Sequence, residues 1–96
     1  MSTFSYLRCF LASEADRDDF EEELKELMEV ALVTAGCRWI EMGRDIWDDR
    51  KHMLVAEWDD DASLDAFEAG ESFQKFRDHW PDERWAEPLE VRRLHD

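Results

Sequence analysis

Small apolar residues alternate with bulkier ones near the start of the chain, in residues 4–11 (FSYLRCFL). The small apolar set is Leu7, Cys9 and Leu11. The bulky, partly polar set is Tyr6, Arg8 and Phe10. A period of two predicts a β-strand. Because large side chains occur on both sides of this strand, we expect a sheet that is covered on both faces.

The period then changes to three or four residues, which is typical of a helix over residues 16–34. Its apolar stripe is Phe20, Leu24, Leu27 and Ala31. The preceding segment SEAD supplies residues that begin helices, with acids in the first turn, where the helix dipole favours them. We expect Gly36 to end the helix in the left-handed conformation.

Two more strands are predicted at residues 37–45 and 51–58, with a turn at Asp48–Asp49 between them. Asp60 or Asp61 can cap a helix that Gly70 breaks. A further short helix follows, with Ser72 as its expected cap, and Pro81 stops it. Residues 89–94 form the last strand. The inner faces of the two short helices carry Leu64, Phe67, Phe73 and Phe76.

The resulting order, β-α-β-β-α-β, predicts one α+β domain over residues 1–96, a ferredoxin-like fold with an antiparallel sheet and both helical segments on one face. If the helices cover Leu7, Cys9 and Leu11, the other face exposes Tyr6, Phe10 and Trp39. Such an apolar surface is large for a monomer, so we expect a homodimer whose sheets face each other.

Charge distribution narrows the choice of partners. The chain of 96 residues has a net charge of −14. Residues 14–29 hold nine acids and two bases, residues 57–71 hold seven acids and no base, and the remainder is neutral. This pattern is typical of solvated helix faces and disfavours binding to nucleic acid or to an anionic membrane. No apolar run is long enough for a membrane span, and residues 1–10 lack signal-peptide features, which favours a cytoplasmic protein.

Metal and redox sites are not indicated. The two cysteines, Cys9 and Cys37, make neither a disulfide framework nor a metal quartet, and we expect reduced thiols that fill the core. The run Asp59–Asp61 lacks the spacing and glycine of a calcium loop, and a capped helix start explains it better. The three isolated glycines form no phosphate-binding loop.

Three features together resemble the antibiotic biosynthesis monooxygenase family of dimeric α+β barrels. A strand ends in Trp58, the acidic segment DDDASLDAFEAG follows, and Phe73 and Phe76 make a Phe-x-x-Phe pair. The AGC at residues 35–37 is similar to the helix exit of that family. The resemblance implies a homodimer with a cavity in each subunit. Some members of the family oxidise polycyclic phenols with O2 and without metal or flavin, so the resemblance implies this activity as an expectation for the chain.

The chain also departs from the family pattern. Many members carry a histidine nine residues after the tryptophan, where this chain has Phe67. The asparagine, tryptophan and histidine of haem-degrading members have no counterparts in register, which argues against haem degradation.

His79 is the best candidate for a general base, because histidine titrates near neutral pH. His95 lies at the terminus, and we expect His52 to be a surface or strand-end residue. On the predicted cavity face, Tyr6 and Arg8 are candidates for binding substrate. Arg8 could instead pair with a carboxylate such as Glu41 across the dimer.

Four tryptophans are further candidates. Trp39 and Trp58 could line a flat aromatic pocket or pack at strand ends and the interface. Trp80 could contact substrate, and both Trp80 and Trp85 could act as a lid or as a dimer contact. These residues leave two hypotheses: a cofactor-free monooxygenase acting on a small phenolic or quinol-like compound, and a non-catalytic dimer that binds a small ligand or supports a partner protein.

Overall fold

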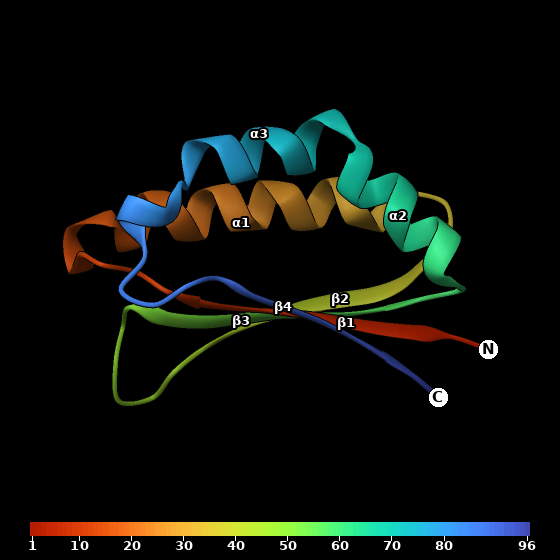
Figure 1. Cartoon of the computed structure of the whole chain (residues 1–96), viewed down its shortest axis with the longest axis horizontal. Coiled ribbons are helices and arrows are strands. Elements are labelled where there is room, and N and C mark those ends of the chain that lie inside the picture. The colour runs from red at the N-terminus through yellow and green to blue at the C-terminus, as the bar shows by residue number, and fades with distance from the viewer.

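The sheet of the computed structural model, which describes residues 1–96, has four antiparallel strands in the order β2-β3-β1-β4. The strands are β1 (Thr3–Phe10), β2 (Cys37–Arg44), β3 (Lys51–Trp58) and β4 (Glu90–His95). The helices α1 (Arg17–Leu32), α2 (Asp61–Ala69) and α3 (Glu71–His79) all lie on one face of the sheet (Figure 1). Short 3-10 turns occupy Glu14–Asp16 and Asp82–Arg84. The predicted ferredoxin-like α+β fold is therefore confirmed.

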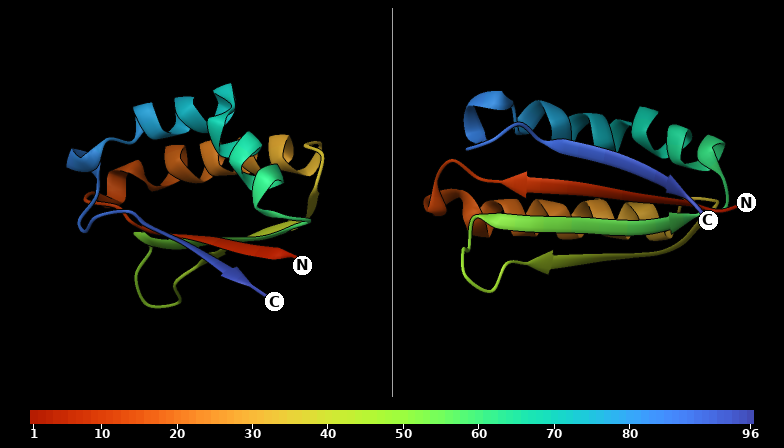
Figure 2. Two further views of the ribbon diagram at one scale, coloured as in Figure 1. Left: turned by 45° about the vertical axis from the view of Figure 1, so that its right-hand side comes forward. Right: turned by 60° about the horizontal axis from the view of Figure 1, so that its bottom comes forward.

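Two helical rows cover that face, one made by α1 and the other by α2 followed by α3 (Figure 2). Gly70 alone separates α2 from α3, and it serves as the last cap of one and the first cap of the other. The opposite face of the sheet carries no helix. We call it the open face.

Strand pairing assigns each side chain to one of the two faces. Leu7 lies opposite Leu54 and Val91, and this row faces the helices. Tyr6 lies opposite Val55 and Arg92, and this row is on the open face. The alternation predicted for residues 4–11 therefore separates the two faces as expected.

The core joins the helix-side row of the sheet to the apolar stripe of α1. Phe20, Leu24, Leu27 and Ala31 are all buried, as the stripe predicts. Leu7, Cys9, Leu11, Leu54, Ala56 and Trp58 bury the sheet side of the same core. None of the helices is both long and apolar enough to span a bilayer.

The ends of the helices agree with the sequence in part. Asp60 caps α2, with its Oδ1 accepting the main-chain N–H of Ser63 at 2.8 Å. Ser72 is not the cap of α3, because that helix already begins at Glu71 after Gly70. Gly36 does adopt a positive φ of 93°, but α1 ends earlier, at Leu32.

Candidate functional site

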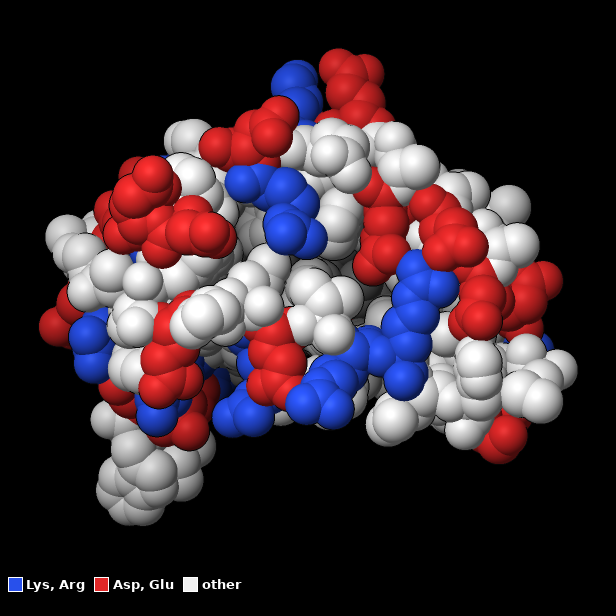
Figure 3. All heavy atoms as spheres, viewed as in Figure 1, with Lys and Arg blue, Asp and Glu red and all other residues white.

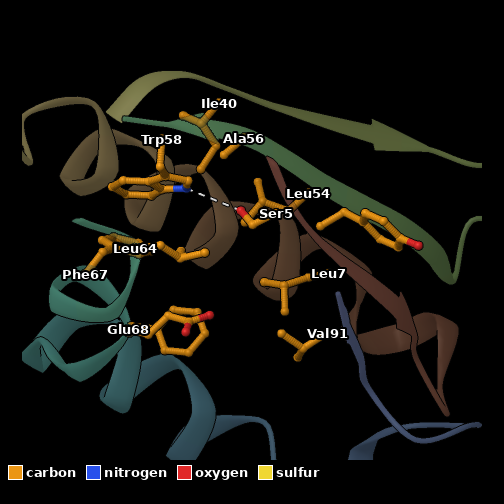
Figure 4. A pocket seen from close by; sticks show the side chains of 12 residues that line it. Ser5, Leu7, Ile40, Leu54, Ala56, Trp58, Leu64, Phe67, Glu68 and Val91 are labelled. Carbon is orange, nitrogen blue, oxygen red and sulfur yellow. Dashed lines mark hydrogen bonds between the residues drawn. The ribbon is translucent and has the colours of Figure 1, made fainter. Parts of the chain in front are cut away.

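An apolar pocket lies on the helix side of the sheet, under α2 (Figure 4). In Figure 4, Trp58, Leu64 and Phe67 lie to one side of the space and Leu7 and Val91 to the other. All four strands contribute to its floor, and α2 and α3 form its roof. The apolar lining residues are Leu7, Ile40, Leu54, Ala56, Trp58, Leu64, Phe67, Phe73 and Val91.

Aromatic packing nearly closes this pocket. The ring centroids of Trp58 and Phe67 are 5.1 Å apart, and those of Phe67 and Phe73 are 5.6 Å apart. The space open to the centre of a water molecule is about 20 Å³, which suits about one water. In the conformation described, the pocket therefore has no room for an aromatic ligand.

Two polar side chains line the pocket. Ser5 Oγ accepts a hydrogen bond from Trp58 Nε1 at 3.3 Å, which fixes the orientation of the indole (Figure 4). Glu68 of α2 supplies the carboxylate at the pocket, and its Oε1 lies 2.6 Å from Arg93 Nη2. The same Arg93 nitrogen lies 2.7 Å from Asp65 Oδ1. Arg93 thus fastens α2 to the edge strand β4.

The sequence contains only a weak indication that Arg93 connects β4 to α2. Arg93 shares its face with Val91, and Ser5 lies opposite it on β1, so alternation places the guanidinium on the helix side of the sheet. The charge pattern predicts that the acids of α2 lie on a solvated face. The Asp65 side chain is indeed 66% exposed, but Asp65 and Glu68 also make ion pairs with Arg93, and Asp61 Oδ1 lies 3.9 Å from Arg93 Nη1.

His79 lies at the end of α3 and does not line the pocket. Its Nδ1 lies 2.7 and 2.8 Å from the two carboxylate oxygens of Glu23 on α1. The side chain of His79 is 59% exposed. The carboxylate of Glu23 orients the imidazole, as in many catalytic pairs, but the pair faces solvent.

Trp80 and Trp85 are core residues, so the expectation of a lid or a dimer contact is wrong for both. Each is buried, and the Trp80 ring centroid lies 5.0 Å from that of Phe20. Their indole N–H groups are satisfied internally. Trp80 Nε1 donates to Glu23 at 3.1 Å, and Trp85 Nε1 donates to the carbonyl oxygen of Trp80 at 3.0 Å.

The remaining candidates are divided between the two faces. Trp58 lies in the pocket, whereas Arg8 and Trp39 lie on the open face. Tyr6 borders the pocket, but its register with Arg92 turns the side chain to the open face. Arg8 pairs with Glu90 of its own chain at 3.2 Å, and Trp39 Nε1 donates to Glu57 at 2.8 Å.

His52 lies near the start of β3, as one of the two expectations had it, but it is not a surface residue. Its side chain is fully buried, with Nε2 2.7 Å from Glu21 Oε2 and Nδ1 without a partner. Arg44 Nε lies 3.0 Å from the same Glu21 oxygen. Strand alternation carries the missed signal, because His52 shares its parity with the buried Leu54 and Ala56.

No group of three or more His, Cys, Asp or Glu side chains is arranged to hold a metal ion. Cys9 and Cys37 are free thiols. Asp59, Asp60 and Asp61 act separately. Asp59 pairs with Arg38, Asp60 caps α2, and Asp61 accepts a hydrogen bond from Thr3 Oγ1 at 2.7 Å.

The family model for antibiotic biosynthesis monooxygenases matches residues 9–79 of the sequence. This range runs from the end of β1 to the end of α3 and contains most of the pocket. No curated protein matches the sequence closely enough to count as a relative.

Solved structures show the same fold at low sequence identity. A Nitrosomonas europaea protein, provisionally assigned as an antibiotic biosynthesis monooxygenase, superposes with a TM-score of 0.89 at 13% identity, covering 99% of this chain and 89% of that one. A second antibiotic biosynthesis monooxygenase gives 0.86 at 19% identity, covering 98% and 97%. Rv0793 from Mycobacterium tuberculosis gives 0.86 at 16% identity, covering 100% and 95%. At these identities the likeness establishes the fold alone.

Proposed function

Because the chain belongs to the antibiotic biosynthesis monooxygenase family, we propose that it is a cofactor-independent monooxygenase that oxidises a small phenolic or quinol-like compound with O2. The observation that carries this proposal is the pocket under α2. Its walls are almost entirely apolar, and Glu68 places one carboxylate at its edge. An apolar chamber with a base at its margin suits the deprotonation of a phenol away from water.

The proposed reaction needs little from the protein beyond substrate binding, a general base and the exclusion of water. The base removes the phenol O–H proton, and the phenolate transfers an electron to O2. The two radicals combine to form a C–O bond on the ring, and loss of water leaves a quinone. One phenol and one O2 thus give one quinone and one water, with O2 as the oxidant. The protein raises the rate by positioning the ring and excluding solvent.

Substrate entry requires α2 to move. A benzene-sized ligand occupies a cavity of roughly 150 Å³, far more than the closed pocket offers. Leu64 and Phe67 of α2 form the roof, so displacing this helix opens the space. The ion pairs of Arg93 with Asp65 and Glu68 hold the roof closed and are exchanged for water when it opens.

Two side chains are candidates for the base. Glu23 orients the imidazole of His79 through Nδ1, which leaves Nε2 available as the base. In this role His79 acts on a substrate that extends past α3. Glu68 lines the pocket itself and becomes free when Arg93 releases it. Trp58 supplies a flat wall for an aromatic ring. We also propose substrate-binding roles for Tyr6, Arg8, Trp39 and Trp80. These roles require the assembled dimer or a rearranged core.

Oxygen uptake tests the proposal and the base together. The purified protein is supplied with a panel of hydroquinones and polycyclic phenols after chelation of metals. The variants are His79→Ala, Glu68→Gln and, as the exposed control on α3, Lys75→Ala. We expect uptake that survives chelation, persists in Lys75→Ala and falls at least a hundredfold in the variant that lacks the base. Uptake that no variant alters would discard both bases, and uptake no faster than the protein-free blank would discard the oxygenase.

A non-catalytic ligand-binding dimer is the second candidate, and the filled pocket favours it. Phe67 occupies the space between Trp58 and Phe73 at ordinary packing distances. Under this alternative, Phe67→Ala creates a cavity that binds apolar aromatic compounds without converting them to products. Titration with a non-oxidisable aromatic compound, followed by thermal unfolding, distinguishes this outcome from catalysis.

Both candidates include a homodimer formed through the open face. The charges on that face are balanced, in contrast to the acidic helix layer seen in Figure 3. By strand register, its rows carry three bases and three acids: Arg8, Lys51, Arg92, Glu41, Glu57 and Glu90. Two copies of a chain with a charge of −14 repel each other least where these rows meet. Light scattering at several protein concentrations tests the dimer.

A further inference from the structure

Two large apolar side chains stand in solvent at the turn between β2 and β3. Ile46 is 85% exposed and Trp47 is 88% exposed, more than any other tryptophan of the chain. Isolated exposed apolar residues are common, but an adjacent pair that includes a nearly bare tryptophan is not. Tryptophan is also among the residues most enriched in the energetic centres of protein interfaces. We call residues 45–50 the β2–β3 turn.

The β2–β3 turn has a defined shape. Asp45 Oδ2 accepts the main-chain N–H groups of Trp47 at 2.8 Å and Asp48 at 2.9 Å. The N–H of Asp45 donates to the carbonyl oxygen of Lys51 at 2.9 Å. Arg50 also pairs with Asp48. Because these bonds already order the backbone, the turn loses little conformational entropy when a partner covers Trp47.

The position of the turn indicates what could cover it. Figures 1 and 2 show the connection between β2 and β3 dropping away from the helices, past the open face of the sheet. Any body that packs flat against the open face therefore meets the turn at its margin. The open face itself presents apolar side chains, among them Met53 at 39% and Leu94 at 56% exposure.

We propose that the β2–β3 turn is a clasp on a second copy of this chain, with Ile46 and Trp47 of each protomer packed against the apolar surface of the other. This inference rests on the proposed dimer through the open face. A second copy fits better than an unrelated protein because the charges of that face are balanced within an otherwise acidic molecule, so two such faces meet without net repulsion. In a two-fold dimer, each turn meets its partner in the same way, so two clasps close together.

Dissociation of the dimer measures the clasp. Analytical ultracentrifugation over a concentration series compares the wild type with Trp47→Ala and Ile46→Ala. The control is Val33→Ala, because Val33 is 86% exposed but follows α1 in the helix layer. We expect Trp47→Ala to raise the dissociation constant at least tenfold, Ile46→Ala to raise it less, and Val33→Ala to leave it unchanged. A dissociation constant for Trp47→Ala equal to that of the wild type would overturn the clasp.

A fourth variant separates the clasp from the dimer on which it rests. Met53→Arg places a charge in the open face itself, on β3 and outside residues 45–50, and is expected to yield monomers. Monomeric Met53→Arg together with a fully dimeric Trp47→Ala would overturn the clasp and keep the open-face dimer. A wild type that is monomeric at every concentration would overturn both.

Fluorescence gives a second readout that does not depend on stability. The difference between the emission spectra of the wild type and Trp47→Phe isolates the signal of Trp47. We expect this emission at short wavelength and protected from acrylamide in the dimer, shifting to long wavelength on dilution to monomers. Emission from Trp47 that is fully quenchable in the dimer would contradict the proposal.

Discussion

Gly36 is a position where a single methyl group conflicts with the fold. Its φ of 93° is one that residues with a side chain rarely adopt, and an added Cβ would lie 2.2 Å from Ser63 Oγ and 2.4 Å from Ser63 Cβ. The residue thus sets how closely the end of the α1–β2 connection approaches α2.

We expect Gly36→Ala to lower the free energy of unfolding by about 1–3 kcal/mol, because it combines backbone strain with a close contact. Gly43→Ala is the matched control. A Cβ at Gly43 meets no atom within 4 Å, and alanine suits a strand better than glycine. Urea unfolding at one protein concentration measures both. Equal stabilities for the two variants would contradict this account of Gly36.

The two thiols are predicted to differ in reactivity. Burial raises the pKa of Cys9 to about 12, and desolvation also raises the pKa of Cys37, which is only partly buried. A thiolate is the reactive form, so Cys9 should resist alkylation in the folded protein at pH 8, while Cys37 reacts slowly. Mass spectrometry after labelling with and without urea tests this order. Labelling of Cys9 ahead of Cys37 in the folded protein would refute it.

At the scale of elements, the cap of α2 links helix stability to pH. The main-chain N–H of Ser63, followed by its hydroxyl, lowers the pKa of Asp60 below its usual value by hydrogen bonding to the carboxylate. A depressed pKa in the folded state means that the cap stabilises the protein above the unfolded-state pKa of about 4 and is lost as pH falls further.

We therefore expect Asp60→Ala to lower the urea midpoint at pH 7 and to have a smaller effect at pH 3. The comparison with wild type at each pH removes the general effect of titrating the other acids. Asp60→Asn is the control, because asparagine caps helices without a titrating group. A deficit of Asp60→Ala that is as large at pH 3 as at pH 7 would exclude the ionised cap.

Arg93 is predicted to set how tightly α2 lies over the pocket. Replacing it with alanine removes the ion pairs to Asp65 and Glu68 and should increase amide hydrogen exchange in α2, with little change in α1. Arg92→Ala is the neighbouring control, because Arg92 lies on the open face and pairs with Glu90. Exchange in α2 that is the same in both variants would show that packing alone holds the roof.

Most elements of this fold follow from local pattern, and the departures have a common cause. Alternation and helical spacing predict every strand and all three helices, because each element must turn one apolar side to the core. Alternation along β3 indicates that His52 is buried, but the acids that complete the hydrogen bonds of His52 and Trp80 are distant in sequence. Glu21 pairs with His52, and Glu23 accepts the indole N–H of Trp80, which local pattern does not reveal.

The candidate site was less predictable than the fold. Parity assigns Tyr6, Arg8 and Trp39 to one face and predicts the cavity there, whereas the apolar pocket under α2 lies on the other face with Trp58. Where a pocket forms depends on how closely α2 packs on the sheet, a three-dimensional property that spacing along the chain does not encode. Glu68 therefore emerged only from the structure.

At the scale of the whole molecule, charge is predicted to set the strength of the open-face dimer proposed above. Two protomers, each with a net charge of −14, repel each other, and salt screens this repulsion. The charges of the open faces are balanced, so screening weakens the attraction between these faces less. We expect the dimer to become tighter as NaCl is raised from about 20 mM to about 500 mM, since the screening length falls several-fold over this range. Ultracentrifugation across the series measures the dissociation constant. A dimer that weakens steadily with salt would indicate that ion pairs between the faces dominate.

The strand order leaves two strands, β2 and β4, with one unpaired edge each. A bare edge invites another chain to add a strand, and repeated addition leads to fibrils. Adjacent arginines at positions 92 and 93 lie in β4, and the β2 edge carries Arg38, Glu41 and Arg44. A chain that added to either edge in register would bring like charges together on neighbouring strands. The basic residues that balance the charge of the sheet thereby also protect the protein against aggregation.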